Sequence, residues 1–107
     1  VGTFSIYLRI GQSVEQQRKA MTSALFDTPF MTPKGLVDSY NRYNQIIREV
    51  ALENGAILID GEDDIPGDPA HFVDSVHFTD AGSRVMGDRI ARSLIADRNI
   101  SALFRKE

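Results

Sequence analysis

The sequence has 107 residues, of which 42% are hydrophobic and 25% are charged, and its formal net charge is −3. This length allows one domain at most, the composition is that of a globular chain, and the mild acidity disfavours nucleic acid and anionic membranes as partners. The sequence lacks cysteine, which excludes disulfides and thiolate metal sites, and it has no apolar run near the roughly 20 residues of a membrane span. We therefore expect a single domain over residues 1–107, complete or partial, with no membrane span.

The N-terminal stretch Phe4–Ile10 predicts a buried strand, because it is rich in β-branched and aromatic residues and ends at Gly11. The sequence begins at Val1, within what reads as this strand, and not at a methionine. We therefore expect an N-terminal segment to be missing, so that the compartment, whether cytoplasmic or secreted, stays undetermined.

Three segments have the three- and four-residue periodicity of amphipathic helices. Ser13 and Gln16 have the spacing of a capping box at the start of the first helix. Gly55 supplies a stop for the second helix, and Thr79 is the expected N-cap of the third. The helices are expected at residues 14–26, 36–53 and 80–97.

A short apolar run, Ala56–Asp60, follows the second helix directly after Gly55. A helix, a tight glycine turn and an apolar run form the second half of a βαβ unit, in which the two strands are parallel. The pattern therefore predicts an α/β fold. Asp60 would lie at the carboxyl end of its strand, the edge at which open α/β sheets bind ligands.

Asp74 and His77 form the candidate catalytic pair, three residues apart and directly before the third helix. A histidine acts as a general base near neutral pH when one ring nitrogen faces the group to be deprotonated and an acceptor holds the other. Asp74 is close enough to be that acceptor if residues 74–77 form a tight turn. Asp68 and His71 have the same spacing, but Asp68 precedes a proline in a polar loop, so we interpret His71 as a surface or supporting residue.

Residues 36–95 resemble the C-terminal half of the SGNH hydrolases, the superfamily of GDSL-type lipases and esterases. In that family an Asp-x-x-His block supplies the acid and the base of a Ser-His-Asp triad. The resemblance implies that Asp74 orients His77 and that His77 is the general base. It is carried by an ordered series of a helix, a strand and a loop block, at Tyr40–Ala51, Gly55–Asp60 and Phe72–Gly82.

The resemblance further implies a three-layer flavodoxin-like fold, present here as its C-terminal portion, and hydrolysis of an ester by a serine nucleophile. The substrate would be a small-molecule or carbohydrate ester, and no cofactor or metal is needed. The Gly-Asp-Ser and Gly-x-Asn-Asp blocks of the family are absent from this sequence, and none of its serines has the context of a nucleophile. We therefore expect the nucleophile and the oxyanion-hole residues upstream, and this chain alone to be inactive.

Two alternatives stay open. A non-catalytic remnant or interaction module with the same fold is favoured if these residues are the whole gene product. A metal-dependent hydrolase that uses His77, Asp74 and Asp60 is less favoured, because so few ligands rarely suffice. A parallel strand pair also needs neighbours, so we expect another copy or a missing N-terminal segment to cover an apolar sheet edge near residues 4–10 or 56–60.

Overall fold

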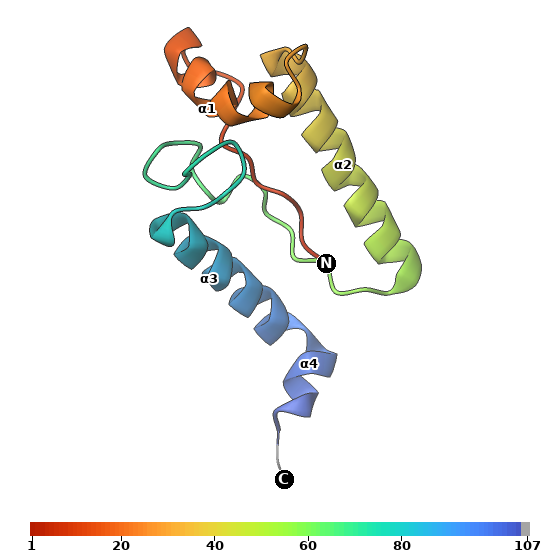
Figure 1. Cartoon of the computed structure of the whole chain (residues 1–107). Helices are drawn as coiled ribbons and strands as arrows, with labels where there is room; N and C mark the ends of the chain where they lie inside the picture. Colours follow the sequence, from red (N-terminus) through yellow and green to blue (C-terminus); the bar gives the residue numbers. More distant parts are fainter. Residues whose placement is uncertain (106–107) are drawn as a thin grey trace.

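The computed structural model describes residues 1–105 as four helices joined by extended segments and loops (Figure 1). Residues 106 and 107, which belong to the predicted domain, lie outside the described part. The three long helices confirm those predicted from sequence periodicity, and the short α4 forms where no helix is predicted. The helices are α1 (Val14–Asp27), α2 (Pro33–Asn54), α3 (Asp80–Ala96) and α4 (Arg98–Leu103).

The helix ends are set by local hydrogen bonds, and the predicted end signals are confirmed. The hydroxyl of Ser13 accepts from the amide of Gln16 at 3.2 Å, and the Gln16 side chain accepts from the amide of Ser13 at 2.8 Å. Gly55 ends α2 with φ at 62°, a left-handed conformation that favours glycine. The hydroxyl of Thr79 accepts from the amide of Gly82 at 3.2 Å and so starts α3.

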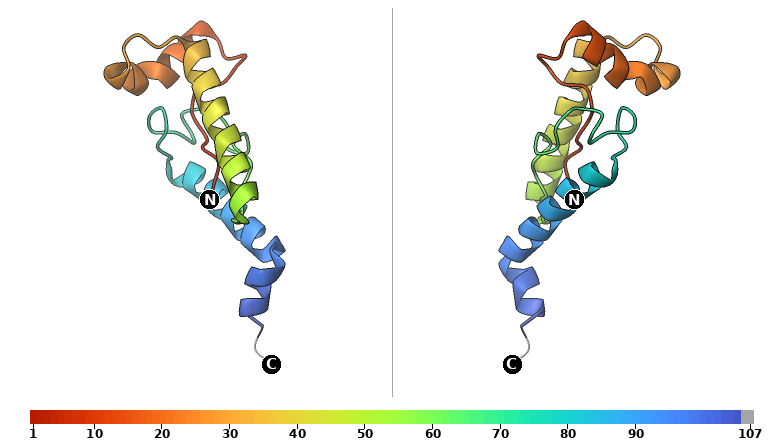
Figure 2. Two further views of the ribbon diagram at one scale, coloured as in Figure 1. Left: turned by 90° about the vertical axis from the view of Figure 1, so that its right-hand side faces the viewer. Right: turned by 90° about the vertical axis from the view of Figure 1, so that its left-hand side faces the viewer.

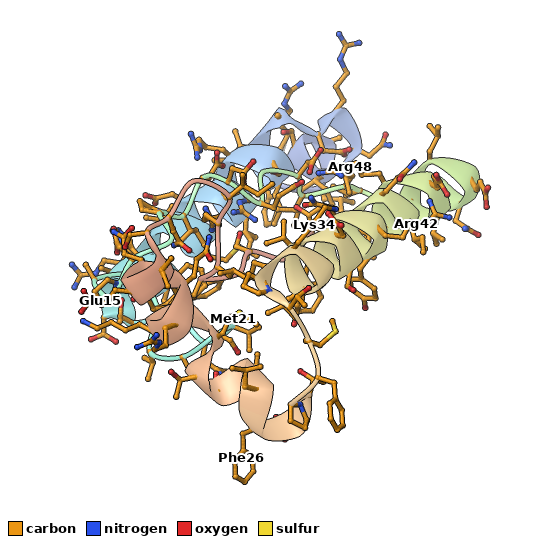
Figure 3. The ribbon with its side chains drawn as sticks, turned by 90° about the horizontal axis from the view of Figure 1, so that it is seen from above. Glu15, Met21, Phe26, Lys34, Arg42 and Arg48 are labelled. Carbon is orange, nitrogen blue, oxygen red and sulfur yellow. The ribbon has the colours of Figure 1, made fainter. Side chains whose placement is uncertain are left out.

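The core lies where the extended N-terminal segment passes between α1, α2 and the loop before α3 (Figure 2). The molecule is elongated, with a radius of gyration of 16.0 Å, whereas a compact domain of this length has about 13 Å. Large side chains therefore stay exposed, and Phe26 projects from α1 into solvent (Figure 3). The buried apolar side chains are Ile6, Tyr7, Leu8, Ala20, Met21, Leu36, Val37, Ile65 and Phe72.

The predicted α/β fold is wrong, because the described residues contain no sheet. Two isolated β-bridges occur within residues 1–105, and the parallel one joins Gly2 to Ile59. Around it, the amide of Thr3 donates to the carbonyl of Ile59 at 3.0 Å, and the amide of Ile59 donates to the carbonyl of Val1 at 2.8 Å. The three-layer flavodoxin-like architecture expected from the resemblance to SGNH hydrolases is therefore wrong for this chain. The predicted apolar sheet edge is wrong for the same reason.

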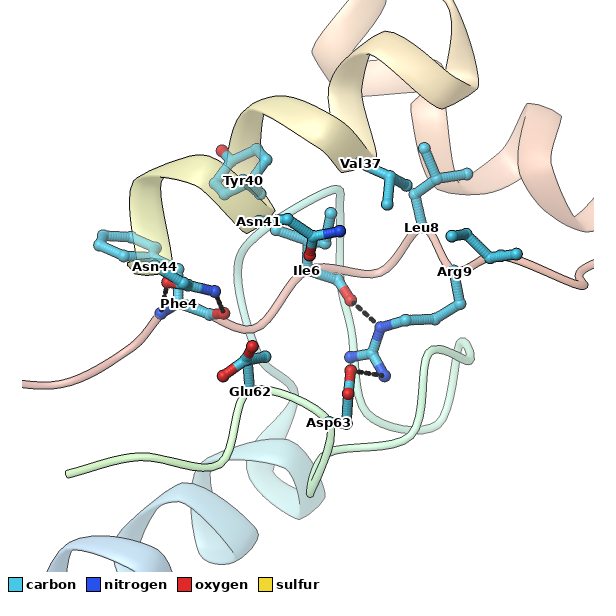
Figure 4. Close-up of a pocket in the computed structure, with 11 residues that line it drawn as sticks. Phe4, Ile6, Leu8, Arg9, Val37, Tyr40, Asn41, Asn44, Glu62 and Asp63 are labelled. Carbon is cyan, nitrogen blue, oxygen red and sulfur yellow. Dashed lines mark hydrogen bonds and ion pairs between the residues drawn. The ribbon is translucent and has the colours of Figure 1, made fainter. Parts of the chain in front are cut away.

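The first predicted strand forms no ladder because its backbone is bonded to a side chain and a loop. The amide of Phe4 donates to Oδ1 of Asn44 at 2.7 Å, and the carbonyl of Phe4 accepts from Nδ2 of Asn44 at 2.9 Å (Figure 4). The amide of Tyr7 donates to the carbonyl of Ser75 at 3.0 Å. These partners satisfy single residues and do not continue along the segment, so it stays extended without becoming a strand.

We expect Asn44→Ala to lower the free energy of unfolding by about 2 kcal/mol, because it removes a buried amide that makes two hydrogen bonds with the Phe4 backbone. Urea unfolding followed by circular dichroism measures the change. Asn41→Ala is the matched control, since Asn41 is exposed on the same helix and its side chain makes no hydrogen bond within residues 1–105. Equal losses in the two variants would contradict the role assigned to Asn44.

Candidate acid–base site

The candidate site is the turn from Asp74 to His77, immediately before α3. Oδ1 of Asp74 accepts from the backbone amides of Val76 at 3.0 Å and His77 at 2.8 Å, which closes the turn. The ring Nδ1 of His77 lies 2.8 Å from Oδ2 and 3.0 Å from Oδ1 of Asp74. The structure thus brings the two predicted site residues together, while their catalytic role stays a prediction.

The electrostatics of the pair leave one ring nitrogen open. The amides of Val76 and His77, followed by the His77 ring, hold the pKa of Asp74 below its ordinary value, so this carboxylate is ionised at neutral pH. An ionised carboxylate only accepts hydrogen bonds, so the Nδ1 that faces it carries the proton and Nε2 carries the lone pair. Nε2 makes no hydrogen bond to the described residues, and the His77 side chain is 77% exposed. It is therefore accessible to a reactant.

The turn is held against the rest of the molecule through Ser75. Its amide donates to the hydroxyl of Ser23 on α1 at 2.9 Å, and the two hydroxyls are 2.8 Å apart. Its carbonyl accepts from the amide of Tyr7. The sequence analysis missed Ser23 as an anchor, although its position three residues after the buried Ala20 places it beside the inner face of α1.

No hydroxyl group within residues 1–105 is hydrogen-bonded to the His77 ring as a candidate for deprotonation. Within residues 1–105, the only hydrogen-bond partner of the His77 ring is Asp74. The hydroxyl of Ser75 is engaged by Ser23 on α1. A cavity of about 280 Å³ lies elsewhere, between the extended N-terminal segment, α2 and the loop that carries Glu62 and Asp63, and neither member of the pair lines it (Figure 4).

Asp68 and His71 form a second pair with similar local geometry. The ring Nδ1 of His71 is 2.7 Å from Oδ1 of Asp68, which also accepts from the His71 amide at 3.1 Å. The hydrogen bond from the ring is the main cause that lowers the pKa of Asp68. The His71 side chain is only 21% exposed, and its backbone carbonyl accepts from the amide of Thr79 at 3.0 Å. The ring of His71 is therefore more enclosed than that of His77, and it is the His71 backbone, not the side-chain pair, that is bonded to the start of α3.

Asp60 is not brought to the candidate site but is bound to α2. The Nε atom of Arg48 lies 3.0 Å from Oδ2 of Asp60, and its Nη2 lies 3.0 Å from Oδ1 and also pairs with Glu62. Arg48 lowers the pKa of Asp60, and the two carboxylates raise the pKa of Arg48. Within residues 1–105, no three side chains of the metal-binding types gather into a site, so the ligand set of the metal alternative is not assembled.

Gly82 sets the distance between α3 and the loop that carries both pairs. A Cβ at this position would overlap with the carbonyl oxygen of His71 and would lie 3.0 Å from Cβ of Phe78. Glycine is therefore required for the first turn of α3 to lie against this loop.

Comparison with known proteins gives no match, since no protein-family model, curated protein or solved structure matches the chain. The resemblance to SGNH hydrolases therefore rests on the residues quoted above and stays a prediction. Among the helices of residues 1–105, none has the length and apolar character needed to cross a membrane.

We expect Gly82→Ala to lower the free energy of unfolding by at least about 2 kcal/mol, because the new methyl group overlaps with backbone that cannot move without separating α3 from the loop. Gly87→Ala is the matched control on the same helix. A Cβ there meets nothing within 4 Å, so we expect a gain of about 0.5–1 kcal/mol from helix propensity. Thermal and urea unfolding measure both variants, and effects of the same sign would refute the close approach.

We expect Asp74→Asn to reverse the tautomer of neutral His77. Because two backbone amides hold Oδ1, the asparagine oxygen keeps that position and its amino group replaces Oδ2, 2.8 Å from Nδ1. This donor is closer to Nδ1 than the oxygen at the Oδ1 position, which is 3.0 Å away, so it leaves Nδ1 unprotonated and moves the ring proton to Nε2. Long-range ¹H–¹⁵N NMR spectra of the ring nitrogens distinguish the tautomers.

Asp68→Asn is the control for this experiment, because it alters only the His71 pair and leaves the tautomer of His77 unchanged. A wild-type His77 that already carries its proton on Nε2 would contradict the geometry assigned to the site.

Proposed function

We propose that Asp74 and His77 are the acid and the base of a serine ester hydrolase. The observation that supports this most is the state of the His77 ring, whose Nδ1 is held 2.8 Å from an ionised carboxylate while the side chain is exposed to solvent. His71 is paired with Asp68 in a similar way, but its side chain is only 21% exposed, so its ring is less accessible to a reactant than that of His77.

The proposed chemistry follows from the two ring nitrogens. A serine hydroxyl attacks the ester carbonyl as its proton moves to Nε2 of His77, and Asp74 stabilises the imidazolium that forms. His77 then returns the proton to the leaving alcohol. A water molecule repeats the sequence to release the acid from the acyl-enzyme. The serine and the oxyanion donors come from outside the described residues, and the substrate is a small-molecule or carbohydrate ester.

The proposal depends on the local Asp-x-x-His block and not on the architecture. SGNH hydrolases use such a block for the acid and base of their triad, and this chain resembles them in the order of helix, apolar run and block. The α/β sheet expected from that family is not part of the proposal, because the described residues form none.

A non-catalytic role is the second candidate. It is favoured by one observation, that no hydroxyl within residues 1–105 donates to the His77 ring. Under this alternative the pair only closes the turn before α3, and the chain is an interaction module.

We expect the protein expressed from its full reading frame to hydrolyse an aryl acetate and to be labelled by a fluorophosphonate, whereas the 107-residue chain alone is not labelled. His77→Ala should lower kcat by about 10³-fold or more, and Asp74→Asn by about 10²- to 10⁴-fold. His71→Ala is the matched control and should change kcat by only a few-fold.

Three outcomes would each contradict one part of this proposal. Activity that survives His77→Ala refutes the assigned base. Labelling of the 107-residue chain refutes an external nucleophile. Absence of labelling in the product of the full reading frame favours the non-catalytic role.

A further inference from the structure

The chain exposes more surface than a compact monomer of its size. Its accessible surface is 7536 Å², whereas a folded monomer of 11.9 kDa exposes about 6,000 Å². The excess of about 1,600 Å² lies within the area that each chain of an obligate homodimer buries, roughly 1,000–2,500 Å². One partner of the size of this chain is therefore enough to cover it.

A continuous apolar part of this surface lies on α2, the longest helix. Tyr43, Ile46 and Val50 recur at three- and four-residue spacing, and Phe4 extends the row through an edge-to-face contact with Tyr43, with ring centroids 5.4 Å apart. We call these four residues the α2 stripe. Each is between 40% and 50% exposed, so one side of each packs on its own chain and the other is free.

The α2 stripe also contains a hollow that a side chain could fill. Phe4, Ser39, Tyr40 and Tyr43 line an open hollow of about 330 Å³ at one end of the stripe. Its lining is mainly aromatic, which suits a large apolar side chain from a facing helix.

Two opposite charges, Arg42 and Glu49, flank the α2 stripe on either side of Ile46 along the helix. Their spacing allows each to pair with the opposite charge of a second copy. Arg42 precedes Ile46 by four residues and Glu49 follows it by three, and both lie exposed on the same flank, with Nη1 of Arg42 3.9 Å from Oε1 of Glu49. If a second α2 is related to the first by a two-fold axis near Ile46, the Arg42 of each copy comes next to the Glu49 of the other. This arrangement buries the stripes against each other and places opposite charges along the rim.

We propose that the α2 stripe is a homodimer interface, on which the α2 of a second copy of this chain packs in the antiparallel direction. The interface joins identical patches, so it closes as a dimer and does not extend into a filament. The candidate acid–base turn lies on other elements and is independent of it.

The first test is sedimentation velocity of the purified 107-residue chain. The wild-type chain should sediment at twice the mass of the 11.9 kDa monomer. Ile46→Lys should raise the dissociation constant at least tenfold, because it places a charge in the apolar contact. Leu52→Lys is the matched control, since Leu52 is 86% exposed on the opposite side of α2 and should leave the dimer intact. Circular dichroism checks that both variants are folded.

The second test separates contacts between copies from contacts within one copy. Arg42→Glu and Glu49→Arg should each weaken self-association, because each creates like-charge pairs across the two-fold axis. An equimolar mixture of the two variants should restore the dimer, since both cross-axis pairs are then opposite in charge. An ion pair within one chain cannot be restored by mixing.

A monomeric wild-type chain overturns the proposal. A dimer that is weakened equally by Ile46→Lys and Leu52→Lys overturns the location of the interface. A mixture of the two charge variants that stays monomeric overturns the antiparallel arrangement.

Discussion

The structure depends on how the buried backbone of the extended N-terminal segment finds hydrogen-bond partners. Burying an unpaired amide or carbonyl costs about as much as a lost hydrogen bond, so each partner must be fixed in place. Three different parts of the chain provide them: the run at Ile59 pairs with Thr3, the side chain of Asn44 pairs with Phe4, and the carbonyl of Ser75 pairs with Tyr7. This segment therefore joins α2, the second apolar run and the loop before α3.

These hydrogen bonds also fix the position of the candidate site. Ser75 lies inside the turn, and it is bonded to the extended segment through its carbonyl and to α1 through Ser23. Gly82 then lets α3 lie against the same loop, where a larger residue would separate them. The turn is thus supported by three elements, although Asp74 and His77 need only each other to form their contact. In the proposed role of His77 as a general base, this support would keep the ring oriented before a substrate binds.

The features that could be predicted from the sequence are those decided within a few residues. Ser13, Gly55 and Thr79 mark helix ends because capping is local, and the contact of Asp74 with His77 follows from a spacing of three. The fold was predicted wrongly because pairing of distant segments is not encoded in their periodicity. Nothing in the helical pattern indicates that Asn44 takes the place of a neighbouring strand. Likewise the two Asp-x-x-His pairs have the same spacing, and although their sequence context differs, only packing shows that the ring of His77 is exposed and that of His71 is enclosed.

The contacts of the two Asp74 carboxylate oxygens have a consequence for proton transfer. Oδ1 accepts from two backbone amides and lies 3.0 Å from Nδ1 of His77, whereas Oδ2 lies nearer to Nδ1, at 2.8 Å, and has no other hydrogen-bond partner within residues 1–105. The bonds that shape the turn come from backbone amides, which do not titrate, so gain or loss of a proton on the ring alters the strength of the contact with the carboxylate and leaves these amide bonds in place. The imidazole can cycle between its neutral and charged forms with little reorganisation of the backbone, which is the property that makes a preorganised base efficient.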